Sequence, residues 1–163
     1  GFIDGRALRL PTIVVRPGRP NKAASTWASS ILREPLSGYS AVCPVTEESK
    51  MWMLSPRRVV ESFRHAQVLD AVTWGPHRVV NLPGITGSVT ESLQALSRAG
   101  GNSARARVTF EHDPFIQEIV DGWANTFETA RGLEMGFKSD TGLDEIVNVF
   151  LEDDLPGQHV YYD

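Results

Sequence analysis

A short apolar run near the start of the chain, residues 8–15, constrains the fold more than any other stretch. Its Leu, Ile and Val side chains are followed by Pro17-Gly18, where a proline and a glycine interrupt the strand pattern. The run therefore predicts a buried strand that delivers a loop at its C-terminal edge. Ligands of open α/β sheets bind at that edge, so the loop is the first place to look for a functional site.

Helical and strand-like patterns alternate along the rest of the chain. Apolar spacing and capping residues predict helices over residues 23–36, about 56–71, 90–99, 113–123 and 141–155. Short β-like runs predict strands over residues 39–45, 51–54, 77–82 and 105–110, and a ragged tail over 158–163. The second predicted buried strand, 77–82, is followed by Pro83-Gly84, just as the opening strand is followed by Pro17-Gly18.

This alternation predicts an α/β fold in which strands 8–15 and 77–82 are parallel neighbours. Strands 39–45 and 51–54 are predicted to form a small hairpin outside the main sheet. A parallel sheet that helices cover on both faces needs more than two strands. We therefore expect the sheet to begin before Gly1 or to be completed by another copy, which predicts a homo-oligomer.

Composition limits the classes of partner. The chain has 163 residues, 41% of them hydrophobic, which is enough for one core, so we expect residues 1–163 to form a single unit. Its 16 basic and 20 acidic residues include no basic block, which argues against nucleic acid and anionic membrane as partners. Cys43, the single cysteine, is predicted to be a small core residue and fits a reducing cytoplasm.

Few motifs for chemistry stand out in the residues themselves. The stretch Gly84-Ile85-Thr86-Gly87 has the wrong spacing for a dinucleotide-binding turn, and a tight turn explains it better. The four histidines lie far apart, so we predict no metal site. Arg57 and Arg58 begin a predicted helix, where a guanidinium and helix N–H groups suit a carboxylate or phosphate. The alternative is that both arginines are ordinary solvated surface residues.

Four segments taken together resemble a known family. They read LPTIVVRPGRPNKAAS at residues 10–25, REPL at 33–36, SPR at 55–57 and NLPG at 81–84. In this combination they resemble the C-terminal half of an extended short-chain dehydrogenase/reductase, of the NAD-dependent epimerase/dehydratase family. The D-erythronate dehydrogenase-like branch is the most similar subgroup, and the resemblance covers residues 3 to about 155.

The resemblance implies a fold and a function. The fold would be the last strands of a Rossmann-type parallel sheet plus a small α/β substrate-binding lobe. The chain would be the substrate-binding half of an NAD-dependent oxidoreductase acting on a small sugar acid. Pro17 and Gly18 would lie beside the nicotinamide of NAD, Asn21 and Ser25 would face the substrate, and Arg57 would hold the substrate carboxylate.

The chain also departs from the family pattern. It contains neither the glycine-rich cofactor turn nor the Tyr-x-x-x-Lys pair, since the residue four positions after Tyr39 is Cys43. We therefore assign no catalytic residue here and expect the N-terminal cofactor-binding half to be absent from this sequence. Two other functions remain open, namely a nucleotide-sugar epimerase or dehydratase, and a non-catalytic binding protein that lacks the cofactor half.

Overall fold

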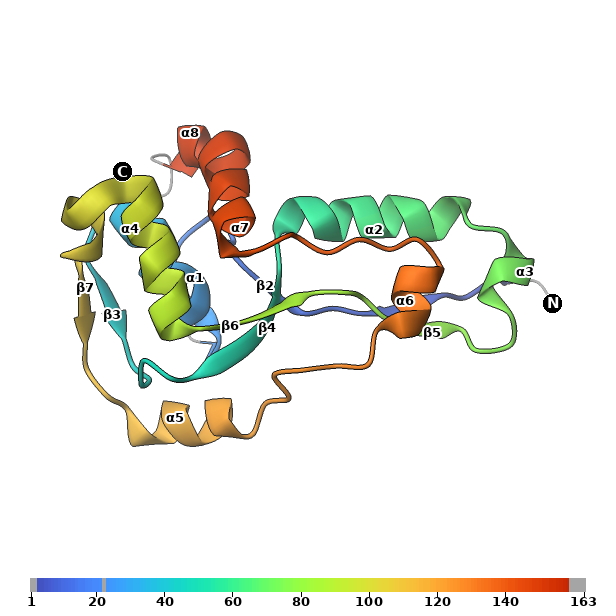
Figure 1. Ribbon diagram of the computed structural model, residues 1–163, viewed down its shortest axis with the longest axis horizontal. Helices are drawn as coiled ribbons and strands as arrows, with labels where there is room; N and C mark the ends of the chain where they lie inside the picture. The colour runs from blue at the N-terminus through green and yellow to red at the C-terminus, as the bar shows by residue number, and fades with distance from the viewer. Residues whose placement is uncertain (1–2, 22, 159–163) are drawn as a thin grey trace.

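A computed structural model describes residues 3–21 and 23–158 and has a mixed α/β fold (Figure 1). The strands are β1 Ala7–Arg9, β2 Thr12–Ile13, β3 Ala41–Cys43, β4 Lys50–Leu54, β5 Val79–Asn81, β6 Ile85–Ser88 and β7 Val108–Phe110. The α-helices are α1 Thr26–Leu36, α2 Pro56–Val68, α3 Ala71–Trp74, α4 Val89–Arg105, α5 Pro114–Asp121, α6 Ala130–Glu134, α7 Leu143–Val149 and α8 Leu155–Gln158. A π-helix, η1 Phe150–Asp154, joins α7 to α8.

The opening strand is not one strand but two, with different partners. β1 runs parallel to β5, whereas β2 runs parallel to β4. The change of partner falls at Pro11, which has no N–H to offer a ladder. Pro11 is buried against Gly84, where an added Cβ would meet the proline ring at 2.8 Å. The prediction of a fully buried strand is right only for its end, because Val14 and Val15 are completely buried while Leu10 is partly exposed.

The predicted parallel pairing of the two buried-strand candidates is confirmed. β1 and β5 are in register from Ala7 opposite Val79 to Arg9 opposite Asn81. The N–H of Leu82 continues the pairing by donating to the main-chain oxygen of Arg9 over 3.0 Å. Within the part of the chain that the structure describes, β1 pairs on one side only. The other edge of β1 is therefore open to a further strand.

The predicted hairpin of residues 39–45 and 51–54 is wrong. β3 pairs in parallel with β7, and β4 lies between β2 and an antiparallel strand, β6. β6 occupies the stretch that we expected to be a tight turn. Gly87 in this strand lies against Met53 and Leu143, where an added Cβ would meet side-chain carbons at 3.0 Å. Close packing, rather than a turn, explains this glycine.

Two hydrophobic clusters divide the core. The larger one surrounds α1, α4 and α7 and contains Ile31, Leu96 and Phe150, all fully buried. The smaller one includes Val59 and Ala66 of α2 and Val80 of β5. In Figure 1, α2 lies along one side of the β1–β5 pair in the right half of the molecule. The helices α1, α4 and α7 of the larger cluster lie in the left half, and β2 runs between the two halves.

Helix starts agree with their sequence signals, but the last predicted helix is divided. Ser55 caps α2 by accepting from the N–H of Arg58, and Asp113 caps α5 by accepting from two main-chain N–H groups. The predicted helix 141–155 is instead α7, η1 and α8 in succession. Gln158, predicted to begin a ragged tail, is fully buried, and residues 159–163 lie outside the described residues.

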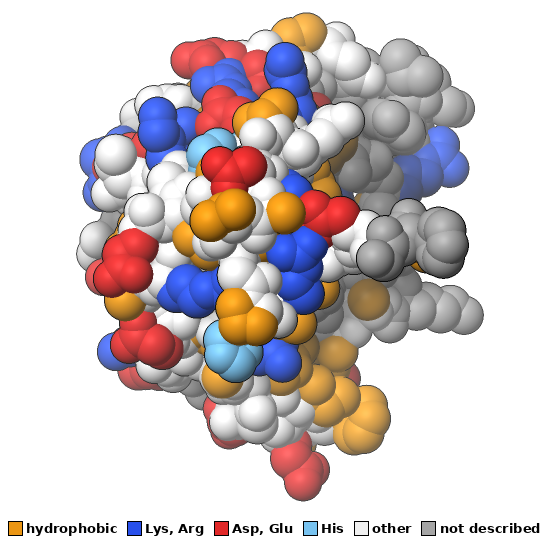
Figure 2. Space-filling model, turned by 90° about the vertical axis from the view of Figure 1, so that its right-hand side faces the viewer, with side chains coloured by type: hydrophobic (Ala, Val, Ile, Leu, Met, Phe, Trp, Pro, Cys, Tyr) orange, Lys and Arg blue, Asp and Glu red, His pale blue; other side chains and the backbone are white. Residues whose placement is uncertain are grey.

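The surface carries both signs of charge. On the face in Figure 2, Lys and Arg side chains are interspersed with Asp and Glu and with exposed hydrophobic residues. Among the described residues, no helix is both long enough and apolar enough to cross a membrane.

Candidate functional site

A cavity of about 540 Å³ lies beside the loop that precedes α1. Its walls come from this loop, the first turns of α1, β3 with its flanking residues, and the start of α5. The lining residues are Pro20, Asn21, Ala23, Ala24, Thr26, Trp27, Ser30, Glu34, Ser40, Ala41, Val42, Pro44, Asp113, Phe115 and Ile116. The lining mixes apolar surface with a few polar groups, and the volume lies in the range of small-molecule sites.

Asn21 lines this cavity and also shapes the loop. Its predicted role toward substrate stays a prediction. Its side-chain oxygen accepts from the N–H of Ala23 over 2.9 Å and from the hydroxyl of Thr26 over 2.5 Å. These bonds fold the loop onto the first turn of α1. The amide Nδ2 of Asn21 makes no hydrogen bond to another described residue, so its two N–H donors are available to a ligand.

The first turns of α1 contribute buried polar groups to the same cavity. Ser30 and Glu34 line it although both are buried, and Trp27 lines it with a buried indole N–H that no described residue accepts. The Glu34 carboxylate binds Arg33, with Nη2 and Oε1 2.7 Å apart. α1 is therefore buried nearly all round, with polar groups on the side that faces the cavity.

The other groups of α1 hold the loop that follows β2. The hydroxyl of Ser29 accepts from the N–H of Arg16 over 3.1 Å. Arg33 donates from Nη1 to the main-chain oxygen of Arg16 over 2.7 Å. Both main-chain groups of Arg16 are thus satisfied by side chains, because no strand continues here to satisfy them.

The next turn of this loop is held from the C-terminal end of the chain. Gly18 donates its N–H to Oε1 of Gln158 over 3.0 Å, and its main-chain oxygen accepts from Nε2 of the same side chain over 3.1 Å. Pro17 is exposed beside it. Pro17, Gly18 and Ser25 do not line the Asn21 cavity, although Ala24 and Thr26 on either side of Ser25 do. Their predicted roles toward NAD and substrate stay predictions.

Arg57 lies apart from the Asn21 cavity and has partners of its own. Its Nε and Nη2 donate to the two carboxylate oxygens of Asp153 over 2.8 and 2.7 Å, and Nη2 also donates to Glu152 over 2.8 Å. This guanidinium lowers the pKa of the Asp153 carboxyl below its ordinary value. The structure therefore does not bring Arg57 together with Asn21, and its role as a carboxylate anchor stays a prediction.

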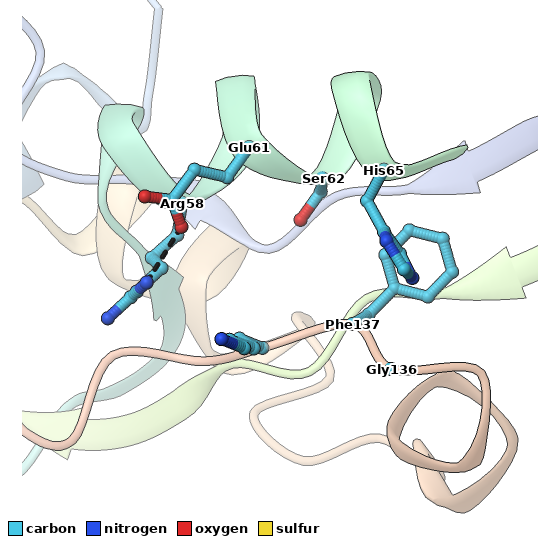
Figure 3. A pocket seen from close by; sticks show the side chains of 7 residues that line it. Arg58, Glu61, Ser62, His65, Gly136 and Phe137 are labelled. Carbon is cyan, nitrogen blue, oxygen red and sulfur yellow. Dashed lines mark hydrogen bonds and ion pairs between the residues drawn. The ribbon is translucent and has the colours of Figure 1, made fainter. Parts of the chain in front are cut away.

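Arg58 lines a second cavity, of about 250 Å³, between α2 and residues 136–138 (Figure 3). Its Nη1 and Nη2 donate to Glu61 and Glu145, each over 2.7 Å. Figure 3 shows Ser62 and His65 extending from α2 toward the same space. Because two carboxylates already bind the arginine, and none of the predicted site residues lines this cavity, we do not place a substrate here.

Neither a reactive cysteine nor a metal centre is found among the residues that the structure describes. Cys43 is fully buried, as predicted for a core residue, and burial raises the pKa of its thiol. Among the described residues, no three His, Cys, Asp or Glu side chains are grouped so as to hold a metal ion.

Comparisons with known proteins identify relatives over nearly the whole chain. The chain is 46% identical over 153 residues to a D-erythronate dehydrogenase of Cupriavidus necator, and 42% identical over 155 residues to a D-erythronate dehydrogenase of Haemophilus influenzae. These alignments cover 94% and 95% of the chain. The chain is thus a homologue of the D-erythronate dehydrogenases. It spans about half the length of these relatives, 47% and 49% respectively.

The fold comparison agrees with this relationship. The crystal structure of a nucleoside-diphosphate-sugar epimerase from Agrobacterium tumefaciens superposes with a TM-score of 0.93 at 43% identity, over 96% of this chain and 46% of that one. The predicted resemblance to extended short-chain dehydrogenase/reductases, and the α/β fold that it implies, are therefore confirmed. No protein-family model matches the sequence.

Sequence reasoning missed two residues that shape the site. Arg33 belongs to the motif REPL, and its burial next to an acidic residue has no periodic signal in the sequence. The sequence predicts a ragged tail from Gln158 onward, because the π-helix that turns this residue inward has no recognisable sequence pattern.

Proposed function

We propose that this chain is the substrate-binding half of an NAD-dependent oxidoreductase that acts on a small sugar acid. One observation carries the proposal: two relatives named D-erythronate dehydrogenase are 42–46% identical to the chain over 94–95% of its length. The chain spans about half of each relative, so the remaining half of the enzyme would supply the groups that this sequence lacks.

The cavity beside Asn21 is the proposed substrate site. The amide of Asn21 lines it together with the buried carboxylate of Glu34 and the buried hydroxyl of Ser30. A polyhydroxy acid offers both acceptors for the amide and hydroxyl donors for the carboxylate. Ser25, at the start of α1, is a proposed second contact. Arg57 lies outside this cavity and is bound to Asp153 and Glu152, so its proposed role as the anchor of the substrate carboxylate is tested separately.

The residues of this chain fit only one end of NAD. Pro17 is exposed and Gly18 has open space where a Cβ would be, so the loop can border a flat ring. No glycine-rich turn is present in the sequence to cradle a pyrophosphate. When bound, NAD supplies the hydride acceptor, and this chain would contribute the loop wall and the substrate cavity.

The proposal is tested by activity of the complete protein that carries this chain. We expect NAD reduction, followed by absorbance at 340 nm, to depend on D-erythronate. The Asn21→Asp variant keeps a side-chain oxygen that can accept from Ala23 and Thr26 but loses the amide donors and adds a negative charge. It should raise the KM for the acid about two- to tenfold, the range of one lost hydrogen bond, with the KM for NAD unchanged.

A matched pair of variants tests the cavity itself. Ala24→Leu adds three carbons to a lining residue, whereas Ala99→Leu adds the same volume at an exposed position of α4. We expect the first to raise the KM for the acid about tenfold and the second to leave it unchanged. Equal effects of the two substitutions would contradict the placement of substrate in this cavity.

A second candidate is a nucleotide-sugar epimerase, favoured by the name of the Agrobacterium tumefaciens protein that superposes on this chain. The complete protein would then interconvert a nucleoside-diphosphate sugar without net reduction of NAD. Turnover of such a sugar and none of D-erythronate would support this candidate. Absence of both activities, with tight binding of either compound, would support a non-catalytic binding protein.

A further inference from the structure

The side-chain amide of Gln158 hydrogen-bonds to a main-chain turn that is 140 residues away in the sequence. Its side chain is 0% exposed, and it both accepts from the N–H of Gly18 and donates to the oxygen of Gly18. A primary amide is the neutral side-chain group that can make this reciprocal pair of bonds. The contact therefore depends on the identity of the residue and not only on its size.

The turn at Gly18 has few other restraints near its Cα. Gly18 has a φ of +96°, in the left-handed region that favours glycine, and no heavy atom lies within 4 Å of an added Cβ. Two residues earlier, the main-chain N–H and oxygen of Arg16 are hydrogen-bonded to Ser29 and Arg33 of α1. The loop is thus held by α1 at one end and by Gln158 at the other, with the exposed Pro17 between them.

The π-helix decides that Gln158 faces this loop. Each main-chain hydrogen bond of η1 spans one residue more than in an α-helix. This π-helix lies between the α-helical segments α7 and α8. Each residue of an α-helix advances the side-chain direction by about 100°, so one residue more or fewer turns every later side chain away. An uninterrupted α-helix would have pointed Gln158 elsewhere.

We propose that Gln158 is a positioning residue, which holds the Pro17-Gly18 loop where it must border the cofactor and lead the chain into the substrate cavity. This inference rests on the proposed function. A loop that borders the reacting ring must be placed accurately, because a displacement of about 1 Å can cost on the order of a hundredfold in rate. The two hydrogen bonds of the Gln158 amide provide that accuracy, and the side chain need not contact substrate or cofactor.

A glutamate at position 158 would make the contact with Gly18 depend on pH. An ionised carboxylate can only accept, so it would oppose the oxygen of Gly18, whereas a protonated carboxyl has one donor and one acceptor and restores both bonds. Burial raises the pKa of such a carboxyl, which brings its protonation toward an accessible pH. The Gln158→Glu variant should therefore lose function at high pH and regain it at lower pH.

The first test follows kcat/KM for the acid in the complete protein as a function of pH. At pH values where the new carboxyl is ionised, we expect Gln158→Glu to fall about ten- to a hundredfold below wild type. The deficit should close as the pH is lowered, whereas Gln158→Ala should show a similar deficit at every pH. Gln67→Glu, at an exposed position of α2, is the matched control and should follow wild type throughout.

The second test needs no activity. Hydrogen exchange of the peptide that contains Gly18, measured by mass spectrometry on the complete protein, should be slow in wild type and fast in Gln158→Ala. Unchanged exchange would overturn the proposal, because the amide contact would not then restrain the loop.

The two measurements separate the positioning role from the proposed function. Fast exchange in Gln158→Ala with wild-type kcat/KM would overturn the positioning role and leave the proposed function intact. A wild-type protein with a protected Gly18 but no activity on any sugar acid would overturn the proposed function, and the positioning role with it. A Gln158→Glu deficit that does not depend on pH would also overturn the role, because it would indicate general damage.

Discussion

The guanidinium of Arg33, only 3% exposed, donates a 2.7 Å hydrogen bond to the main-chain oxygen of Arg16 and binds the carboxylate of Glu34 at 2.7 Å. One buried side chain therefore links the helix that lines the cavity to the loop that enters it. Removing it would affect both elements at once.

The first prediction concerns this buried cation. Arg33→Met should lower the free energy of unfolding by about 3–5 kcal/mol, because it leaves a buried carboxylate without its arginine partner. Arg33→Met combined with Glu34→Met should recover part of this loss, since the buried carboxylate that Arg33 binds is then removed as well. Urea denaturation followed by circular dichroism measures both, with the exposed Arg64→Met as control. A double variant less stable than the single one would contradict the argument.

Asp140 predicts a pH dependence of stability. Its carboxylate is buried and accepts from the N–H and hydroxyl of Ser55, both at 2.7 Å, and burial raises its pKa above the ordinary value. Between the unfolded and folded pKa values the folded state holds more protons, so stability falls as the pH rises through this window. Asp140→Asn lacks this contribution.

We therefore expect the stability of wild type, relative to Asp140→Asn, to decrease as the pH rises from about 4 toward neutrality. Thermal or urea unfolding of both proteins over this range provides the measurement. A relative stability that increases with pH would mean that the hydrogen bonds from Ser55 outweigh burial and lower the pKa of Asp140.

Arg57 has two possible roles that one experiment separates. As a substrate anchor, Arg57→Ala should lower kcat/KM on the acid about ten- to a hundredfold, the range of one charge-assisted hydrogen bond, and leave NAD affinity unchanged. The charge exchange Arg57→Asp with Asp153→Arg should not restore activity, because the guanidinium has left the anchoring position. Restoration would show that Arg57 acts through its ion pair with Asp153. Arg58→Ala tests the neighbouring arginine.

The isolated chain should bind NAD negligibly. Its sequence offers no glycine-rich turn whose N–H groups could hold the pyrophosphate, so we expect a dissociation constant weaker than about 1 mM by titration calorimetry. The complete protein is the positive control. Micromolar affinity of residues 1–163 alone would contradict the proposal that another half provides the cofactor site.

The open edge of β1 should promote association of the isolated chain. The N–H of Ala7 points toward β5, so the alternate residue Leu8 presents its main-chain groups to the other edge. Sedimentation velocity should show association that increases with concentration. Leu8→Pro, which removes the outward N–H, should reduce it in a variant whose circular dichroism shows that it is folded. A strictly monomeric wild-type chain at high concentration would contradict this prediction.

Local signals in the sequence were sufficient where a structure depends on neighbouring residues. Ser55-Pro56 and Asp113-Pro114 mark helix starts correctly, because the cap hydrogen bonds to main-chain N–H groups two or three residues ahead. The parallel pairing of β1 with β5 was predictable as well, since apolar runs separated by helical patterns favour it. The resemblance singled out Asn21, which lines the cavity beside α1, but its role toward substrate stays a prediction.

Other features depended on contacts between distant segments. The strand at Gly84-Ile85-Thr86-Gly87 exists because β4 offers it an antiparallel partner and Gly87 lets Met53 and Leu143 approach, neither of which a local pattern contains. The burial of Arg33 follows from its partners on the loop after β2 and within α1.

The sequence by itself determined the α/β class, most helix starts and the loop at Pro17-Gly18, because these follow from spacing and short-range hydrogen bonding. Only the tertiary structure decided which side chains hold that loop. Gln158 reaches Gly18 because a π-helix adds a residue to a turn, and its amide is satisfied only by a main chain folded back from the other end of the sequence. Such a contact depends on the packing of the whole chain and has no local pattern in the sequence.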